Sequence, residues 1–152
     1  MKQRRDTSVV EVEVLPMTTL ILPARLESLA CGLALVVQCA HAAGFPSKRV
    51  TEIELAVEEA LANICLYAYP DRSGEVEVRC TWDETRHFVI ELIDAGISFD
   101  VLARPTPDLT GDASQRALGG LGIPLIRALM DNVTYHREGA RNILRLTALL
   151  PQ

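Results

Sequence analysis

A glutamate and an asparagine share one side of an otherwise apolar predicted helix. The stretch ELAVEEALANICLYAYP, residues 54–70, has the spacing of a buried helix and carries Glu59 and Asn63 four residues apart. Side chains at this spacing lie about 40° apart around the axis, whereas Glu58 points about 100° away from Glu59. A glutamate can act as a base, and an asparagine carbonyl oxygen suits Mg²⁺. The pair indicates either a ligand site or a hydrogen bond along the helix surface.

A second unusual carboxylate ends a predicted strand. In RHFVIELID, residues 86–94, the alternation places Asp94 on the same face as Phe88, Ile90 and Leu92. A carboxylate on a core-facing side needs hydrogen-bond donors, which a ligand could supply. Gly96 follows two residues later and would allow a close approach of the backbone. A simple turn begun by an aspartate is the alternative.

The third signal is the glycine-rich stretch LGGLGIPLI, residues 118–126. Glycines at the start of a helix expose free N–H groups, and the helix dipole favours an anion there, so a phosphate could bind. No Gly-Lys-Ser/Thr follows, and the pattern is neither a Walker motif nor a dinucleotide-binding fingerprint. The alternative is that the glycines close a loop onto a helix.

The elements that must position these residues follow from periodicity. We expect a strand at residues 19–24, helices at about 25–43 and 47–68, strands at 75–83 and 86–94, a long loop, a helix from about 119, and a terminal hairpin. Gly44 and Ser47 are the expected C′ residue and N-cap of the two helices. Two hairpins and clustered helices predict an α+β fold, a two-layer sandwich with an antiparallel or mixed sheet covered on one face.

Composition narrows the classes of function. The chain has 152 residues, which is enough for one compact domain. Its net charge of −5 argues against direct nucleic-acid binding. No apolar segment of about 20 residues predicts a membrane span, and no secretory signal is recognisable. Cys31, Cys39, Cys65 and Cys80 lack metal-ligand spacing, so we interpret them as buried thiols of a reducing, cytoplasmic compartment.

Taken together, the three signals resemble a known nucleotide-binding arrangement. E-x-x-x-N at 59–63, D-x-G-x-x-F-D at 94–100 and G-G-L-G at 119–122 look like the asparagine box and the two glycine boxes of the Bergerat (GHKL) ATP-binding fold. The finer match is to the anti-sigma-factor serine/threonine kinases of the RsbW type. This resemblance covers about residues 18–150, and it divides the chain into an N-terminal arm or edge strand, residues 1–17, and one kinase domain, residues 18–152.

The resemblance implies an ATP site with Mg²⁺. Glu59 would be the general base, Asn63 would hold Mg²⁺, and Asp94 would accept a hydrogen bond from the adenine amino group. Gly96 would let the backbone lie against the base, and Asn142 would join the adenine network. Residues 101–118 would form a lid that offers Arg116 to the γ-phosphate. The phosphate-binding segment would be Gly119, Gly120, Leu121 and Gly122.

The resemblance also implies a role. The protein would bind a sigma factor and, alternatively, a STAS-type anti-sigma-factor antagonist, which it would phosphorylate on serine or threonine; family members are commonly homodimers. Two positions depart from the family pattern: Tyr67 stands where a histidine is frequent, and Gly139-Ala140 where two glycines are frequent. The alternatives are a non-catalytic ATP-dependent binding module, a switch kinase with a target other than a sigma factor, and an unrelated α+β enzyme.

Overall fold

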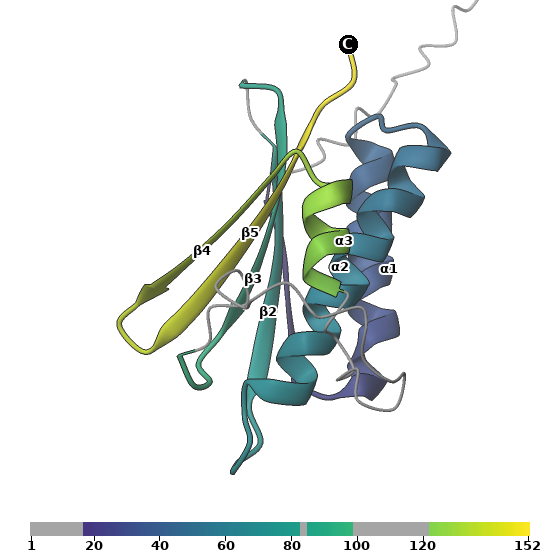
Figure 1. Cartoon of the computed structure of the whole chain (residues 1–152). Helices are drawn as coiled ribbons and strands as arrows, with labels where there is room; N and C mark the ends of the chain where they lie inside the picture. The colour runs from purple at the N-terminus through teal and green to yellow at the C-terminus, as the bar shows by residue number, and fades with distance from the viewer. Residues whose placement is uncertain (1–16, 83–84, 99–121) are drawn as a thin grey trace, which may run out of the picture.

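The computed structural model describes residues 17–82, 85–98 and 122–152. In this part of the chain, a five-stranded sheet has helices packed on one face (Figure 1). Residues 1–16 of the predicted N-terminal arm or edge strand lie outside the described residues, as does the predicted long loop from residue 99 onward. The division at residue 17 stays a prediction, and Met17 itself is the first residue of a strand.

The elements follow the predicted order. The strands are β1 (Met17–Pro23), β2 (Glu75–Trp82), β3 (His87–Asp94), β4 (Asn132–Glu138) and β5 (Arg141–Leu149). The helices are α1 (Leu29–Ala42), α2 (Ser47–Tyr67) and α3 (Gly122–Leu129), and a short 3₁₀ turn, η1 (Leu26–Ser28), precedes α1. The sheet order is β1-β2-β3-β5-β4, and all four pairings are antiparallel. The predicted α+β sandwich is therefore confirmed.

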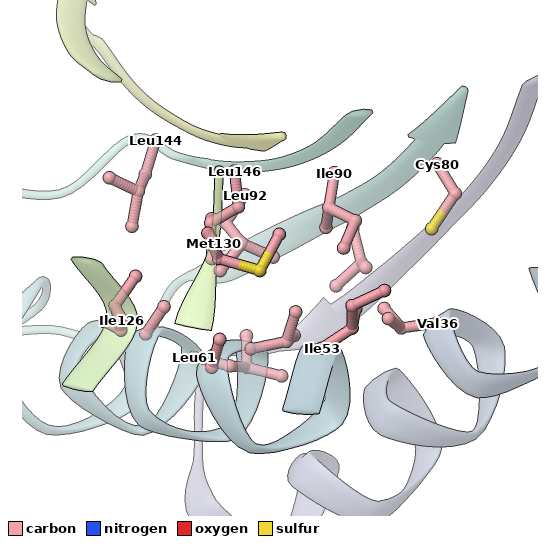
Figure 2. Packing of buried hydrophobic residues seen from close by; sticks show 14 of the residues in the cluster. Val36, Ile53, Leu61, Cys80, Ile90, Leu92, Ile126, Met130, Leu144 and Leu146 are labelled. Atoms are coloured by element: carbon pink, nitrogen blue, oxygen red, sulfur yellow. The ribbon is translucent and has the colours of Figure 1, made fainter. Parts of the chain in front are cut away.

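The core lies between the sheet and the three helices. Figure 2 shows side chains of α1, α2 and α3 facing those of the strands, with Leu61 and Ile126 on the helical side and Ile90 and Leu146 on the sheet side. All four side chains are almost completely buried. Removal of this apolar surface from water is the main force that holds α2 against the strands, and α2 and the strands carry the candidate site.

Two helix boundaries differ from the expectations and one agrees. The N-cap of α2 is Pro46, not Ser47, because Ser47 is already helical and Pro46 has the extended ψ of 156° that an N-cap takes. The first predicted helix begins with η1, so its regular α-helical part starts at Leu29. Gly44 has φ +94° and ends α1 as predicted, because glycine adopts this conformation without strain.

The cysteines are free, but two of them are not buried as expected. Cys39 and Cys80 are buried, whereas Cys31 is exposed and Cys65 is partly exposed. The four apolar runs have helical or strand periodicity, and a helix buries only one face, so a cysteine in an apolar run can still point outward. Burial and the nearby Glu27 carboxylate raise the pKa of the Cys65 thiol.

One arginine fixes the far end of α3. Arg49, in the first turn of α2, donates to the backbone carbonyl of Leu129 and to Asp131 Oδ2 at 3.2 Å. Asp131 Oδ2 also accepts from the amide of Leu149 at 2.7 Å. The C-terminal end of α3 is therefore tied to both α2 and the sheet, while its N-terminal residue, Gly122, begins at the other end of the helix.

Candidate functional site

Asn63 is a buried amide with an unused donor. Its side chain is 4% exposed, and its Nδ2 atom has no hydrogen-bond partner among the described residues. Glu59, one turn earlier on α2, is half-buried, and Glu58 is exposed. A carboxylate can only accept a hydrogen bond from an amide, so a bond between Glu59 and Asn63 would need this Nδ2 atom. The surface hydrogen bond considered from the sequence is therefore absent.

Asp94 is buried at the end of β3, as the strand alternation predicts. The residue is 6% exposed. Its Oδ1 atom accepts from the amide of Gly96 and from Nδ2 of Asn142, both at 2.9 Å. Among the described residues, both hydrogen bonds to this carboxylate end on Oδ1. The second oxygen, Oδ2, is left as an acceptor that a ligand could use.

Asn142 lies directly opposite Asp94 in the pairing of β3 with β5. Its Nδ2 atom donates to Asp94 and also to the carbonyl of Ile97 at 2.8 Å. Its Oδ1 atom accepts from the hydroxyl of Tyr135 at 2.6 Å and from Arg137 at 2.9 Å. Asn142 therefore belongs to the hydrogen-bond network around Asp94, and its predicted place in an adenine network stays a prediction.

Gly96 lies against the end of α2. A Cβ atom at this position would be 2.2 Å from the carbonyl oxygen of Ala68, closer than atoms can approach. The next amide, that of Ile97, donates to the same carbonyl at 2.9 Å. The close approach of the backbone that glycine permits is therefore made to α2. A contact of Gly96 with a base stays a prediction.

These buried polar groups line one cavity. It is bounded by Asn63, Ile64, Ala68, Asp94, Tyr135, Asn142 and Leu144. The empty space is about 340 Å³ including the open mouth, and about 20 Å³ can hold the centre of a water molecule. The inner part is narrow, so a bound base would have to widen it. Apolar walls with a few convergent polar groups are typical of a small-molecule site.

The residues present fit a magnesium ion that is shared with a phosphate ligand. No cluster of three or more histidine, cysteine or acidic side chains that could hold a metal occurs within residues 17–82, 85–98 and 122–152. Mg²⁺ does not need one, because it is often held by one or two protein oxygens together with substrate phosphates and water. Asn63 offers a hard carbonyl oxygen inside the cavity, and its unpartnered amide indicates a position that serves a ligand.

The phosphate-binding segment is described only at its end. Gly122 is the first residue of α3, which confirms that the glycine-rich stretch opens a helix. Arg116, Gly119, Gly120 and Leu121 lie outside the described residues, and their roles stay predictions.

None of the helices in the described residues is long and apolar enough to cross a membrane.

The sequence reading missed Tyr135 and Arg137. Both lie on β4 and hydrogen-bond to Asn142. Arg137 is directly opposite Asn142 in the pairing of β4 with β5. The sequence predicted this terminal hairpin, and alternation along its second strand puts Asn142 in phase with Leu144 and Leu146. Extending the same alternation across the turn would have placed Arg137 beside it.

Comparison with known proteins identifies the family. Residues 22–148 match the model of the histidine kinase-like ATPase domain. The chain is 33% identical over 132 residues to the serine-protein kinase RsbW of Listeria monocytogenes, and the match covers 83% of each chain. It is 25% identical over 91 residues to an anti-sigma F factor of Clostridium acetobutylicum, which is 60% of this chain and 63% of that protein.

A solved structure agrees with the fold. The crystal structure of the RsbU and RsbW domains of a Mycobacterium tuberculosis protein superposes with a TM-score of 0.65 at 16% identity. The match covers 91% of this chain and 33% of that chain, so the similar part is about a third of the larger protein. The chain belongs to the histidine kinase-like ATPase family and, within it, to the serine-protein kinases of the RsbW type.

Proposed function

We propose that this serine kinase binds Mg-ATP in the cavity between α2 and the sheet and phosphorylates a STAS-type anti-sigma-factor antagonist. The observation that carries the proposal is the pairing of two buried polar groups in one cavity: the unpartnered Asn63 amide and the Asp94 carboxylate. The Nδ2 donor of Asn63 is costly to bury without an acceptor, and a phosphate oxygen of the nucleotide would supply one.

Different residues bind the adenine end and the phosphate end of the nucleotide. Asp94 accepts a hydrogen bond from the 6-amino group of adenine through Oδ2, and Asn142 holds the carboxylate in place. At the other end, Asn63 holds Mg²⁺ through its carbonyl oxygen, and the ion neutralises charge on the phosphates. Arg116 and the amides of residues 119–122 complete the phosphate site in this proposal.

Glu59 is the proposed catalytic residue. The antagonist's serine or threonine hydroxyl attacks the γ-phosphorus, its proton passes to the Glu59 carboxylate, and ADP leaves. Glu59 is half-buried one turn from Asn63, which suits a base close to the phosphate end. Most of the acceleration would come from positioning of the reactants and from electrostatic stabilisation, as in phosphoryl transfer generally.

The anti-sigma role follows from the relatives. The Clostridium relative is named an anti-sigma F factor, and the Listeria relative a serine-protein kinase. We propose that this chain likewise binds a sigma factor and releases it when the unphosphorylated antagonist competes. A cytoplasmic location and a homodimer belong to the same proposal. A switch kinase whose target is not a sigma factor would use the same site.

Transfer of labelled phosphate tests the proposal. The protein is incubated with γ-labelled ATP, Mg²⁺ and the STAS-domain protein encoded beside its gene, and label on that protein is followed. Glu59→Ala should reduce transfer by at least about a hundredfold, the usual contribution of a general base. Glu58→Ala is the matched control, because Glu58 is exposed on the same helix. Equal loss in both variants would refute the assignment, and ATP binding without any transfer would favour a non-catalytic binding module.

A further inference from the structure

The side chain of Asn142 has no hydrogen-bonding capacity left. An amide has two N–H donors and an oxygen with two lone pairs. The donors go to Asp94 and to the Ile97 carbonyl, and the oxygen accepts from Tyr135 and Arg137. With all four positions used, Asn142 could contact a base only by giving up one of these bonds. Its place in the network is to position Asp94.

The orientation of this amide is set from β4. A guanidinium only donates, so the Asn142 atom that faces Arg137 must be the oxygen. The NH₂ group then faces Asp94 Oδ1 and the Ile97 carbonyl, both of which are acceptors. Arg137 also donates to the carbonyl of Gly96 at 3.3 Å. Arg137 therefore contacts both Asn142 and the turn that follows Asp94.

The fixed amide of Asn142 in turn restrains the carboxylate of Asp94. Asp94 Oδ1 is held by Asn142 and by the Gly96 amide, which fixes the plane of the carboxylate at the cavity. The oxygen that remains, Oδ2, is an acceptor. The 6-position of adenine carries an amino donor, whereas that of guanine carries a carbonyl acceptor. A fixed acceptor pairs with adenine and repels guanine in the same orientation, but a carboxylate free to rotate would discriminate less.

We infer that Tyr135 and Arg137 are specificity-determining residues that act through Asn142 to fix Asp94 for selection of adenine. This inference rests on the proposed ATP site and adds to it two residues of β4 that position Asp94 through Asn142. Both residues lie on β4, an edge strand in the described sheet.

Calorimetric titration with three nucleotides in Mg²⁺ tests the inference. The nucleotides are the non-hydrolysable analogues of ATP and GTP, and purine riboside triphosphate, which lacks only the 6-amino group of ATP. For the wild type we expect tight binding of the ATP analogue and about tenfold or greater weakening with each of the other two, since one good hydrogen bond contributes about a factor of ten.

The variants are chosen to separate positioning from folding. Arg137→Ala and Asn142→Ala should lower affinity for the ATP analogue by about tenfold, while affinity for purine riboside triphosphate changes by less than about twofold. Tyr135→Phe should change the ratio of these two affinities in the same direction but by less. Arg137→Lys should retain part of the affinity for the ATP analogue that Arg137→Ala loses. His136→Ala is the matched control, because His136 is exposed between the two residues on the same strand.

The outcomes are distinct. Loss of preference for the 6-amino group in Arg137→Ala and Asn142→Ala, with the preference intact in His136→Ala, supports the inference. An equal fall in affinity for the ATP analogue and for purine riboside triphosphate shows a merely structural role and overturns the inference. An unchanged ratio of these two affinities in a folded variant also overturns it. Thermal unfolding checks that each variant is folded. A wild type that binds no ATP analogue refutes the proposed ATP site itself, and the inference with it.

Discussion

Gly96 and Ala68 are in backbone contact at the point where the end of α2 meets the end of β3. A Cβ atom on Gly96 would lie 2.2 Å from the carbonyl oxygen of Ala68. The carbonyl also accepts the amide of Ile97 at 2.9 Å. This contact brings Asn63 on α2 and Asp94 on β3 to the same cavity, so the helix and the strand hold the site only while residue 96 has no side chain.

The first prediction is that Gly96→Ala destabilises the fold and weakens nucleotide binding together. The added methyl group meets backbone, which cannot move aside cheaply, so the free energy of unfolding should fall by about 1–3 kcal/mol or more. Urea denaturation measures it. Gly139→Asn is the control: Gly139 has φ +58° and open space around its Cα, and asparagine tolerates this conformation. A Gly96→Ala protein as stable as the wild type would contradict the described contact.

The second prediction separates stability from function at Asn63. Because its Nδ2 atom is buried without a partner, Asn63→Leu should raise the free energy of unfolding of the nucleotide-free protein by about 1 kcal/mol. The same change should abolish Mg²⁺-dependent binding of ATP. Denaturation without nucleotide and calorimetry with it measure the two effects. A variant that is destabilised without nucleotide would show that the amide already has a partner in the free protein.

The third prediction concerns Tyr69, which follows α2. Its hydroxyl donates to the carbonyl of Glu75 at 2.6 Å and accepts from the amide of Ala95 at 2.8 Å. Tyr69→Phe leaves both backbone groups without this partner, so the free energy of unfolding should fall by about 1–2 kcal/mol. Arg72→Ala is a useful comparison, because Arg72 donates to the carbonyl of Ala95 at 2.7 Å from an exposed position. A smaller loss is expected there, because Arg72→Ala removes one hydrogen bond to the backbone and Tyr69→Phe removes two.

The fourth prediction is a pH dependence of thiol reactivity. Burial and the Glu27 carboxylate raise the pKa of Cys65 above its ordinary value of 9.0. Because the thiolate is the reactive form, alkylation of Cys65 should reach half its maximal rate at a higher pH than a free thiol does. Peptide-resolved mass spectrometry follows each cysteine separately. Glu27→Gln should move the Cys65 profile to lower pH, and a profile unchanged by that substitution would rule out the carboxylate as a cause.

Much of the framework could be predicted from local patterns. Period-2 alternation placed Asp94 and Asn142 on the inner face, and the helical spacing placed Asn63 among buried residues; all three are buried. These predictions depend on geometry within one element, which a sequence of a few residues determines. The α+β class followed because the order of helices and strands limits the possible layers.

The remaining features depend on contacts between distant elements. The clash that requires glycine at position 96 involves a carbonyl at the end of α2, 28 residues away in the sequence. The contact of Arg137 with Asn142 depends on the register of the terminal hairpin. The exposure of Cys31 depends on which face of α1 packs inward. A pattern in one segment carries no information about these choices.

The attachment of α3 by Arg49 has a mechanical consequence. The helix has eight residues, is about 12 Å long and is bound by Arg49 at its Leu129 end, so a tilt about that end would move its Gly122 end most. A tilt of about 10° around the Leu129 end would carry the Gly122 end through about 2 Å, more than half the length of a hydrogen bond. Small rotations at the fixed end would thus be magnified where the proposed phosphate site begins.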